Sequence, residues 1–456
     1  MDGCRVLADA IAGRSPTDRH ASGARPLSRP KAPAGQKPAF VLMLFVITHS
    51  LLSVDRGIMG ILAEPVKHDF QLSDGQLGLL TGFAFAIFFG IGGIPIGILV
   101  DRMSRKHILA ASVFVFSAMT AMAAAAGSFV QLLLTRSLVG AGEAGGTPSM
   151  GSMLSDVYPP ERRAQAMAIF YAGNPLGVIV AFLVGGAVAA QWGWRATVVV
   201  VGLPGVLVAA ALLLFLREPE RRVDGGGGAK GTAPSFGETV RFIGRQRALR
   251  HIMITPILTS AASAGLFSFA GSFFLRTHHL TLPQVGLLLA VFYGTLGAIG
   301  TILCGRLAEK LGRRDESWLP RFCALANVLA ALAVPLLALS PSLPAAVIGL
   351  GLYAVATTGT YGPLLAMLQS SVGARMRGTV TAIFYFLSYL LGSGSGPFMI
   401  GTLSDWLAPG LGADSLRYAI LLAGVLYAWG ALHFWLAARN YKNDIEVARR
   451  IDAARA

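Results

Sequence analysis

Four ionisable residues lie deep inside long apolar stretches of this 456-residue chain. Asp55 and Arg56 fall in the run HSLLSVDRGIMG, and Arg136 and Glu143 fall in TRSLVGAGEAGGTP. If such stretches cross a membrane, each buried charge costs about 2.5–3.5 kcal/mol on an insertion scale. Residues retained at that cost are candidates for function, because a carboxyl group can carry a proton and a guanidinium can bind an anion.

The spacing of these residues predicts how they meet. Asp55 is eight residues and Arg136 seven residues from the outer ends of their expected spans, which is a similar depth of about 10–12 Å, so an Asp55–Arg136 ion pair is geometrically feasible. Arg136 and Glu143 are seven residues apart and share a helix face. Glu143 lies about 10 Å deeper than Arg136, where we expect no partner for it.

These positions predict separate roles. We expect Asp55 and Glu143, the two intramembrane acids, to couple transport to protons. Glu143 is the one without an expected partner, and an unpaired carboxyl in a low dielectric tends to hold its proton. Arg56 and Arg136 are the expected substrate-binding cations, and His49, seven residues before Arg56, shares its helix face. The alternative is a buried ion pair that only fixes the helix register.

The elements that must hold these charges are membrane spans. Apolar residues make up 54% of the chain and charged residues only 13%, against about 25% charged residues in a soluble domain. A bilayer is crossed by about 20 apolar residues in a helix, because each backbone polar group must be satisfied within the segment. Runs of that size number twelve, at roughly 39–63, 76–100, 107–126, 129–157, 164–190, 195–216, 251–275, 284–304, 318–340, 345–370, 378–403 and 416–438.

The basic residues predict the orientation of the chain. The net charge is +15. If the amino terminus is cytoplasmic, 32 of the 38 Lys and Arg residues fall in segments on the cytoplasmic side of the membrane. Only Lys67, Arg195, Arg276 and Arg417 fall on the other side. This positive-inside bias predicts an inner-membrane protein with both termini in the cytoplasm. Basic residues between apolar runs do not form the continuous face of a nucleic-acid-binding domain.

Composition also divides the chain into segments. We expect a disordered cytoplasmic tail at 1–38, a six-helix bundle at 39–217, a cytoplasmic linker at 218–250, a second six-helix bundle at 251–438 and a second cytoplasmic tail at 439–456. The linker contains four consecutive glycines, which are typical of a flexible connection. Its residues 235–249 predict a basic amphipathic helix on the membrane surface.

The two bundles carry an internal repeat. QLGLL at 76–80 recurs as QVGLL at 284–288, and GILVDRMSRK at 97–106 recurs as GRLAEKLGRR at 305–314, both at an offset of 208. AIFY at 168–171 recurs unchanged at 382–385. The fold class that we expect is therefore an all-α polytopic membrane protein with twelve transmembrane helices in two parallel six-helix bundles.

The loop between the second and third spans resembles the signature loop of the major facilitator superfamily. We expect Asp101 to accept hydrogen bonds at the positive amino end of the eleventh span, and Gly97 to let a neighbouring helix approach closely. The contact would hold the inner side shut; the alternative is a basic turn without a gating role. The expected gating residues are Gly97, Asp101, Arg102 and Arg105, with Arg375 and Arg377 at the eleventh span, and Glu309 with Arg162 and Arg163 in the second copy.

The second half has no comparable intramembrane acid and offers aromatic and hydroxyl side chains instead. Phe267, Tyr385 and Tyr389 are the residues that we expect to contact substrate there. An aromatic wall opposite two arginines suits an amphiphile with an anionic head group. Ordinary helix packing is the alternative for each aromatic residue.

DRGIMG, RSLVGAGEAGGTPS, SDVYPPERRAQAMAIFYAGNPLG and GWR together resemble the spinster-like lipid transporters. The resemblance implies that Asp55, Arg56, Arg136 and Glu143 line the cavity for proton coupling and head-group contact. Vertebrate members of that family export sphingosine-1-phosphate or move lysophospholipids. Organic-anion symporters of the same superfamily share the Asp–Arg pair of the first span and the Arg-to-Glu spacing of the fourth.

The function that we expect is proton-coupled secondary transport of an amphiphilic lipid or drug-like molecule by alternating access. A proton-coupled symporter of sugar acids is the first alternative, and a non-transporting membrane receptor or scaffold is the second. The expected partners are a small amphiphile, protons and membrane lipids, without nucleic acid, and the chain is expected to be monomeric. No nucleophile–base pair or metal-ligand spacing stands out, so neither an enzyme nor a cofactor is expected.

Overall fold

The computed structural model describes residues 36–221 and 235–453, so nearly all of the expected tail at 1–38 lies outside the described residues. Within these two ranges the secondary structure is helical, without strands. The first half contains α2 (Pro38–Phe70), α3 (Asp74–Thr81), α4 (Phe83–Arg102), α5 (Arg105–Met122), η2 (Ala123–Ala125), α6 (Phe129–Glu143), α7 (Gly146–Val157), α8 (Pro160–Tyr171) and α9 (Gly173–Phe215).

The second half follows the linker with a matching set of helices. It contains α10 (Phe236–Arg245), α11 (Arg247–Thr277), α12 (Leu282–Leu289), η3 (Ala290–Leu296), α13 (Gly297–Arg314), α14 (Trp318–Leu339), α15 (Leu343–Thr358), α16 (Tyr361–Ser370), η4 (Ala374–Met376), α17 (Arg377–Leu387), η5 (Ser388–Ser393), α18 (Ser395–Leu411), η6 (Gly412–Asp414), α19 (Ser415–Ala419) and α20 (Leu421–Ala453). The short η3 and η5 segments are π-helical turns inside the eighth and eleventh spans.

The prediction of twelve spans is confirmed. Ten described segments are long and apolar enough to cross a membrane. One of them, Pro160–Phe215, contains the fifth and sixth spans, because the chain turns at Gly193, whose φ is 78°. The fourth span is not among the ten segments, because a break after Glu143 divides it into two short helices, α6 with 15 residues and α7 with 12. With it, the spans number twelve.

Two segments differ from the expected boundaries. The last span was expected at 416–438, followed by a tail, but α19 ends at Ala419 and α20 continues from Leu421 to Ala453. The polar residues after 438 contain neither Gly nor Pro before Ala453, so nothing in the sequence interrupts the helix. The amphipathic helix expected at 235–249 is present as α10 but ends at Arg245, because a break at Gln246 separates it from α11.

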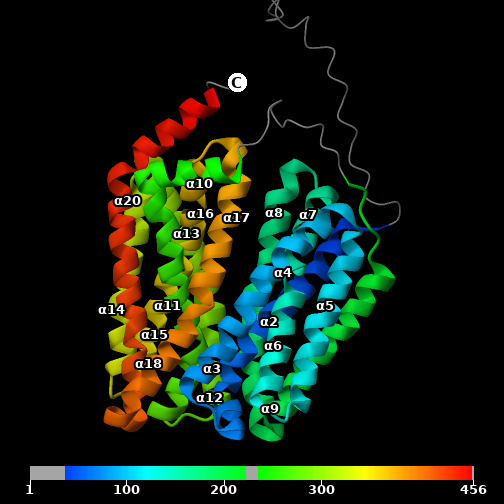
Figure 1. Cartoon of the computed structure of the whole chain (residues 1–456), viewed down its shortest axis with the longest axis vertical. Helices are drawn as coiled ribbons and strands as arrows, with labels where there is room; N and C mark the ends of the chain where they lie inside the picture. The colour runs from blue at the N-terminus through cyan, green and yellow to red at the C-terminus, as the bar shows by residue number, and fades with distance from the viewer. Residues whose placement is uncertain (1–35, 222–234, 454–456) are drawn as a thin grey trace, which may run out of the picture.

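The two halves form separate bundles that meet at one end (Figure 1). We call the end next to α10 the inner end, following the charge-based prediction. At the outer end, drawn at the bottom of Figure 1, α3 and α12 lie between the bundles, whereas α8 and α17 are drawn well apart at the inner end. The ion pairs described at the inner end stay within one half, as for Arg105 with Asp156 and Lys442 with Asp315.

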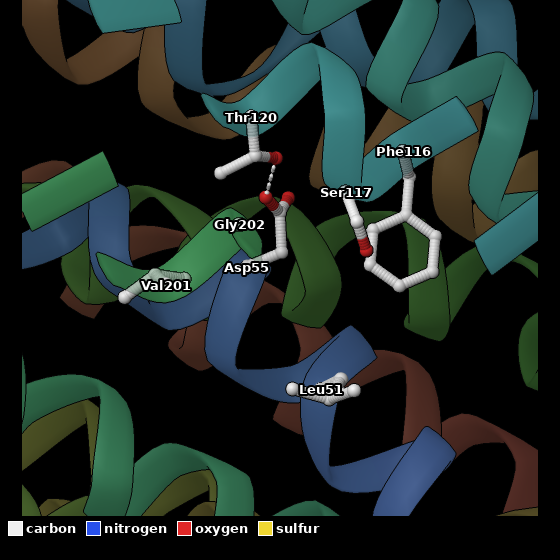
Figure 2. Close-up of a pocket in the computed structure, with 7 residues that line it drawn as sticks. All are labelled: Leu51, Asp55, Phe116, Ser117, Thr120, Val201 and Gly202. Carbon is white, nitrogen blue, oxygen red and sulfur yellow. Dashed lines mark hydrogen bonds between the residues drawn. The ribbon is translucent and has the colours of Figure 1, made fainter. Parts of the chain in front are cut away.

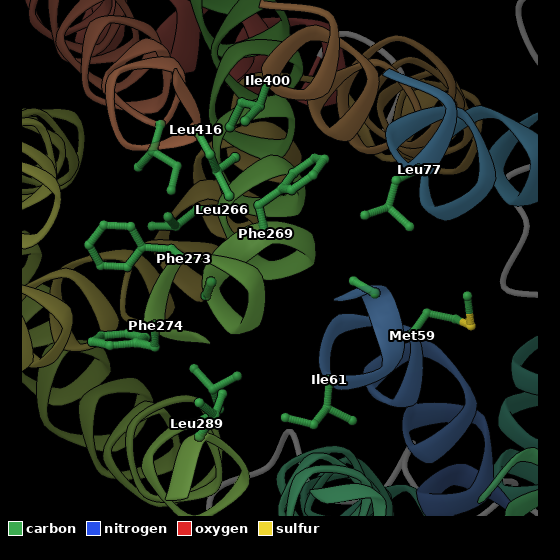
Figure 3. Packing of buried hydrophobic residues seen from close by; sticks show 14 of the residues in the cluster. Met59, Ile61, Leu77, Leu266, Phe269, Phe273, Phe274, Leu289, Ile400 and Leu416 are labelled. Atoms are coloured by element: carbon green, nitrogen blue, oxygen red, sulfur yellow. The ribbon is translucent and has the colours of Figure 1, made fainter. Parts of the chain in front are cut away.

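The buried apolar clusters show the same difference between the outer end, where the halves meet, and the inner end, where they are apart. One buried cluster joins the halves, and it includes Ile61 and Leu77 of the first half together with Phe269, Leu289 and Ile400 of the second (Figure 3). A second cluster lies in the first half alone, and a third lies in the second half alone. The structure is therefore closed at the outer end and open at the inner end.

The internal repeat is visible in local structure as well. Ser73 and Gln76 form a capping box at the start of α3, and Thr281 and Gln284 form the same box at the start of α12, 208 residues later. Directly after these caps, Gly78 packs against the backbone of the eleventh span and Gly286 against that of the fifth. The second and eighth spans therefore occupy equivalent positions in the two halves.

Candidate proton and substrate site

Asp55 and Arg136 form a buried ion pair between α2 and α6. Nη1 of Arg136 donates to Oδ2 of Asp55 at 2.9 Å, and the two side chains are 5% and 2% exposed, respectively. The contact expected from their equal depth is therefore present. A charge pair removed from water to this extent is stable only while both partners remain.

Thr120 of α5 supports this pair from the other side. Its hydroxyl donates to Oδ1 of Asp55, so both oxygens of the carboxylate accept a hydrogen bond (Figure 2). Leu51, Phe116, Ser117, Val201 and Gly202 complete the lining of a narrow space beside Asp55. This space has no room for a water molecule, so Asp55 is dry on the side of α5 and α9.

Arg56 and Glu143 form a second ion pair, which the sequence did not predict. Nε of Arg56 donates to Oε2 of Glu143 at 2.7 Å, so the expectation that Glu143 has no partner at its depth was wrong. The expectation failed because it compared backbone depths, whereas an arginine side chain reaches about one helical turn along its own helix. The Glu143 side chain is fully buried, but 35% of the Arg56 side chain is exposed.

The two ion pairs also differ in their remaining hydrogen-bonding capacity. Oε1 of Glu143 has no hydrogen-bond partner among the described residues, whereas both oxygens of Asp55 have one. A buried carboxylate oxygen without a partner is costly, and protonation or a substrate group would satisfy it. The carboxylate of Asp55 therefore has a donor for each oxygen, and that of Glu143 retains one free acceptor.

The local sequence explains the position of Glu143 in the middle of the fourth span. It is the last residue of α6, and the span bends at Ala144 and Gly145 before α7 begins at Gly146. The surrounding glycines permit close packing, since a Cβ atom on Gly140 would lie 2.4 Å from the carbonyl oxygen of Phe85. The glycine-rich motif therefore lets α4 and α5 pack closely against the backbone of α6.

Aromatic rings surround the exposed side of Arg56. Its Cζ atom lies 5.5 Å from the ring centre of Phe85, 5.4 Å from that of Phe89 and 6.0 Å from that of Tyr389. Nη1 of Arg56 also lies 3.5 Å from the hydroxyl of Tyr389, which comes from the π-helical turn of the eleventh span. Arg56 is thus held by cation–π contacts and joins the acidic site of the first half to the second half.

The other expected substrate contacts are divided between two places. The hydroxyl of Tyr361, which is half exposed, donates to that of Tyr385 at 3.1 Å, so Tyr385 lies on the open inner side. Phe267 packs instead against Phe182 and Tyr293 in the closed outer region. Tyr385 and Tyr389 therefore lie towards the inner side, and Phe267, which is partly buried, lies apart from them.

His49 packs against aromatic side chains and does not reach the ion pairs. Its ring centre lies 4.5 Å from that of Phe170 and 5.6 Å from that of Tyr171. It is buried, and its Nδ1 atom has no hydrogen-bond partner within the described part of the chain. No cluster of three or more potential metal ligands occurs within residues 36–221 and 235–453.

The expected inner gate is open in this conformation. A Cβ atom on Gly97 would meet nothing within 4 Å, so no neighbouring helix packs there. The side chain of Asp101 is outside the described parts of the structure, and its contact with the eleventh span stays a prediction. Arg102 and Arg377 are exposed, and Arg375 is half-buried.

Arg105 has a structural role that the sequence did not predict. It is buried and pairs with Asp156 of α7 and with Glu218, whose carboxylate also accepts from Ser104 and from the backbone N–H of Lys106. Partial burial raises the pKa of Glu218, but these hydrogen bonds outweigh burial and hold the pKa below its ordinary value. Arg105 therefore fixes the inner end of the first bundle to the start of the linker.

The second copy of the loop does not form the expected pair. Glu309 pairs with Arg313 on its own helix at 2.7 Å, with both side chains exposed. Arg163 donates to the carbonyl oxygen of Tyr158, and Arg162 is exposed at the start of α8. The contact predicted between Glu309 and the fifth span is thus absent from this conformation.

An ion-pair network at the outer end joins the two halves and was missed in the sequence. Arg276 of α11 donates to both carboxylate oxygens of Asp74, at 2.8 and 2.9 Å, and pairs with Glu64 of α2 at 2.8 Å. Lys67 donates to Asp74 from the same half, at 2.5 Å, and Ser404 donates to it from α18, at 2.7 Å. The only signal in the sequence was the presence of isolated charges at the outer ends of spans.

The comparisons with known proteins agree with this geometry. The model of the Major Facilitator Superfamily matches residues 44–397. The chain belongs to this superfamily. A solved structure of a bacterial homologue of the human lysosomal transporter Spinster, in an inward-facing and unoccupied conformation, superimposes with a TM-score of 0.80 at 29% sequence identity, covering 90% of this chain and 99% of that one. The chain is a membrane transporter of the spinster type, and not an enzyme.

Curated relatives divide between several substrates. An "MFS-type efflux pump" of Mycolicibacterium smegmatis is 31% identical over 403 residues, covering 88% of this chain and 93% of that one. A "Probable L-galactonate transporter" of Escherichia coli is 24% identical and covers 90% of both chains. The "Sphingosine-1-phosphate transporter SPNS2" of Xenopus tropicalis is 24% identical, covering 87% of this chain and 80% of that one.

Proposed function

We propose that this superfamily member is a proton-coupled secondary transporter of an amphiphilic molecule with an anionic head group, of the lysolipid, sphingoid-phosphate or drug-like type. The observation that carries the proposal is the exposed Arg56, which is paired with the buried Glu143 and surrounded by the rings of Phe85, Phe89 and Tyr389. Arg56 can then form an ion pair either with the carboxylate of Glu143 or with an incoming anion.

The coupling step follows from this competition. While Glu143 is charged, it holds Arg56 and the site is neutral without substrate. When a proton binds Glu143, the charge on Arg56 loses its partner, and an anionic head group restores neutrality. Protonation and binding of the anion therefore favour each other, since each removes an uncompensated charge from a region of low dielectric.

The apolar part of the substrate has a separate place to bind. Phe85, Phe89 and Tyr389 lie around Arg56, and Tyr361 and Tyr385 lie on the open inner side. Aromatic rings bury apolar area without offering many competing hydrogen bonds. The name of one relative, a sphingosine-1-phosphate transporter, supports an amphiphilic substrate.

A symporter of sugar acids is the second candidate. The likeness to the "Probable L-galactonate transporter" and the capacity of Arg56 to hold any carboxylate favour it. A polyhydroxylated acid also requires several hydrogen-bonding side chains. The seventh, eighth, tenth and eleventh spans contain almost no Asn, Gln or Lys apart from Gln284 at the start of α12 and Gln369 at the end of α16, which favours the amphiphile.

The charge distribution supports the orientation that this function needs. If the chain lies in the inner membrane with both termini in the cytoplasm, the open end of the structure faces the cytoplasm. Arg56 is then accessible from the cytoplasmic side and the outer network closes the opposite side. The chain would act as a monomer, because one chain holds the whole site.

Reconstitution in liposomes tests the proposed function. Uptake of sphingosine-1-phosphate, a lysophospholipid and L-galactonate would be measured with and without an imposed pH gradient. The proposal predicts gradient-dependent movement of one of the two lipids and none of the sugar acid. Gradient-dependent movement of L-galactonate without any movement of lipid would establish the second candidate instead.

A further inference from the structure

The repeated sequence AIFY has the same arrangement in the fifth and in the eleventh span. Its phenylalanines are buried, because Phe170 is 0% exposed in the apolar cluster of the first half and Phe384 is 1% exposed in that of the second. The next residue of a helix points about 100° away, so the tyrosines that follow turn out of these clusters. Tyr171 is 50% exposed and Tyr385 is partly exposed. Each half therefore presents one tyrosine from an equivalent position.

The tyrosine of the second half faces the space between the two bundles. Tyr389, one turn further along the eleventh span, contacts Arg56 of the first half. Tyr385 precedes it by four residues, on the same side of the helix, and accepts a hydrogen bond from Tyr361 at 3.1 Å. The ring of Tyr385 therefore lies about 6 Å nearer the inner end than the contact with Arg56.

The tyrosine of the first half faces the same space. Tyr171 is the last residue of α8, and α8 and α17 are drawn on the two sides of the division between the bundles (Figure 1). The hydroxyl of Tyr171 is close enough to those of Tyr385 and Tyr389 to interact with both electrostatically, although these belong to the other half. The two copies of the repeat therefore place a tyrosine on each side of one space.

His49 of α2 fixes the position of Tyr171. The imidazole meets the tyrosine ring edge-on, with ring centres 5.6 Å apart and an interplanar angle of 84°. The imidazole is itself packed against Phe170, with ring centres 4.5 Å apart. His49 precedes Arg56 by seven residues, which is two turns of α2. The ring of Tyr171 is therefore held about 10 Å nearer the inner end than Arg56.

The distance between the cation and the two tyrosines favours a ligand of a certain length. An extended alkyl chain whose head group is bound at Arg56 covers about 10 Å with roughly eight methylene groups. A chain of that length reaches Tyr171 on one side and Tyr385 on the other. Phenol rings bury methylene groups favourably, and their hydroxyls can keep their contact with water at the open inner end.

We propose that Tyr171 and Tyr385 form a chain-binding position inward of Arg56, and that this position selects anionic amphiphiles with a single chain of roughly eight carbons or more. A short anion is bound by Arg56 alone, whereas a long-chain anion is also held between the two rings. The inference rests on the proposed function, since it takes Arg56 as the site of the head group. It adds the length of the substrate and a contact from the first half, Tyr171.

Binding of alkyl phosphates of two lengths tests the proposal. Butyl phosphate and dodecyl phosphate would be titrated by calorimetry into the protein in lipid nanodiscs, with empty nanodiscs as the reference, so that partitioning into lipid is subtracted. Tyr171→Ala should weaken the binding of dodecyl phosphate at least fivefold and that of butyl phosphate less than twofold, because only the longer chain reaches the ring. Tyr385→Ala should show the same dependence on chain length.

Three further variants are the controls. Tyr171→Phe keeps the ring and should bind both phosphates as the wild type does, which separates contact with the ring from a need for the hydroxyl. Tyr418→Ala removes a tyrosine that is 42% exposed on α19, outside the site, and should change neither affinity. Arg56→Gln should weaken the binding of both phosphates by the same factor, because the two ligands share their head group.

The inference is wrong if Tyr171→Ala weakens the binding of the two phosphates equally, or if it weakens neither. Equal affinities of the wild-type protein for butyl and dodecyl phosphate would contradict it as well. Failure of the proposed head-group site gives a different result, since Arg56→Gln would then leave the binding of both phosphates unchanged. All of these measurements are made at equilibrium without a pH gradient, so their outcome does not depend on proton coupling.

Discussion

Two ion pairs lie side by side in the first half, and they differ in exposure and in hydrogen bonding. The Asp55–Arg136 pair is buried on both sides, and its carboxylate is fully hydrogen-bonded. The Arg56–Glu143 pair has one exposed partner and one carboxylate oxygen without a hydrogen bond. Successive residues of α2, Asp55 and Arg56, thus take part in two ion pairs that differ in exposure and in hydrogen bonding.

In the proposed mechanism, burial alone does not identify the proton carrier. Both carboxyl groups are deep in the membrane, and both face an arginine. What separates them is access, because the space beside Asp55 is too narrow for water while the guanidinium beside Glu143 reaches the open inner side. A proton can reach a site only along groups or waters that connect it to solvent.

Removal of the fixed charge should have the largest effect. Asp55→Ala leaves Arg136 buried without a counter-charge, and the expected loss in the free energy of unfolding is about 3–5 kcal/mol. Reversible denaturation in mixed micelles measures it. The double variant Asp55→Ala/Arg136→Met should recover most of the loss, and equal instability of the single and double variants would show that the pair is not the cause.

Removal of the hydrogen bond to Asp55 should have the next largest effect. Thr120→Val keeps the shape of the side chain but leaves one oxygen of a buried carboxylate without a donor, at an expected cost of about 1.5–3 kcal/mol. The same denaturation experiment measures it, with Ser117→Ala as the control on the same helix. If Thr120→Val and Ser117→Ala had the same stability, Asp55 would not depend on this hydrogen bond.

Neutralisation of the exchangeable carboxyl should change stability less. Glu143→Gln leaves Arg56 without its ion pair, but the guanidinium is partly hydrated, so we expect a loss of no more than about 1 kcal/mol. Proton-driven accumulation should fall at least tenfold, while exchange of substrate across the membrane without a gradient continues. A loss of stability as large as that of Asp55→Ala would contradict the distinction between the two pairs.

Removal of one ring beside Arg56 should have the smallest effect on stability. Phe89→Leu retains apolar contact but removes one cation–π interaction, which is worth about 0.5–1 kcal/mol. Its effect should instead appear as a few-fold rise in the substrate concentration needed for half-maximal transport. Phe114→Leu, at an exposed ring on α5 outside the site, is the matched control and should change neither quantity.

The sequence predicted the spans and one of the ion pairs for clear physical reasons. Apolar length defines a span, and equal depth on two antiparallel helices was sufficient to bring Asp55 to Arg136. The pairing of Arg56 with Glu143 was missed because backbone depth ignores the reach of a long side chain. The outer network was missed because Asp74, Arg276 and Asp405 are far apart in sequence and meet only when the two halves dock.

The most direct test of the difference between the two carboxyl groups is infrared pH-difference spectroscopy on the reconstituted protein. A protonated carboxyl group gives a carbonyl stretching band that appears as the pH falls and shifts in D₂O. The account predicts that Glu143→Gln removes this band and that Thr120→Val, beside Asp55, retains it. A band that persists in Glu143→Gln but shifts in Thr120→Val would place the exchanging proton on Asp55 and contradict the account.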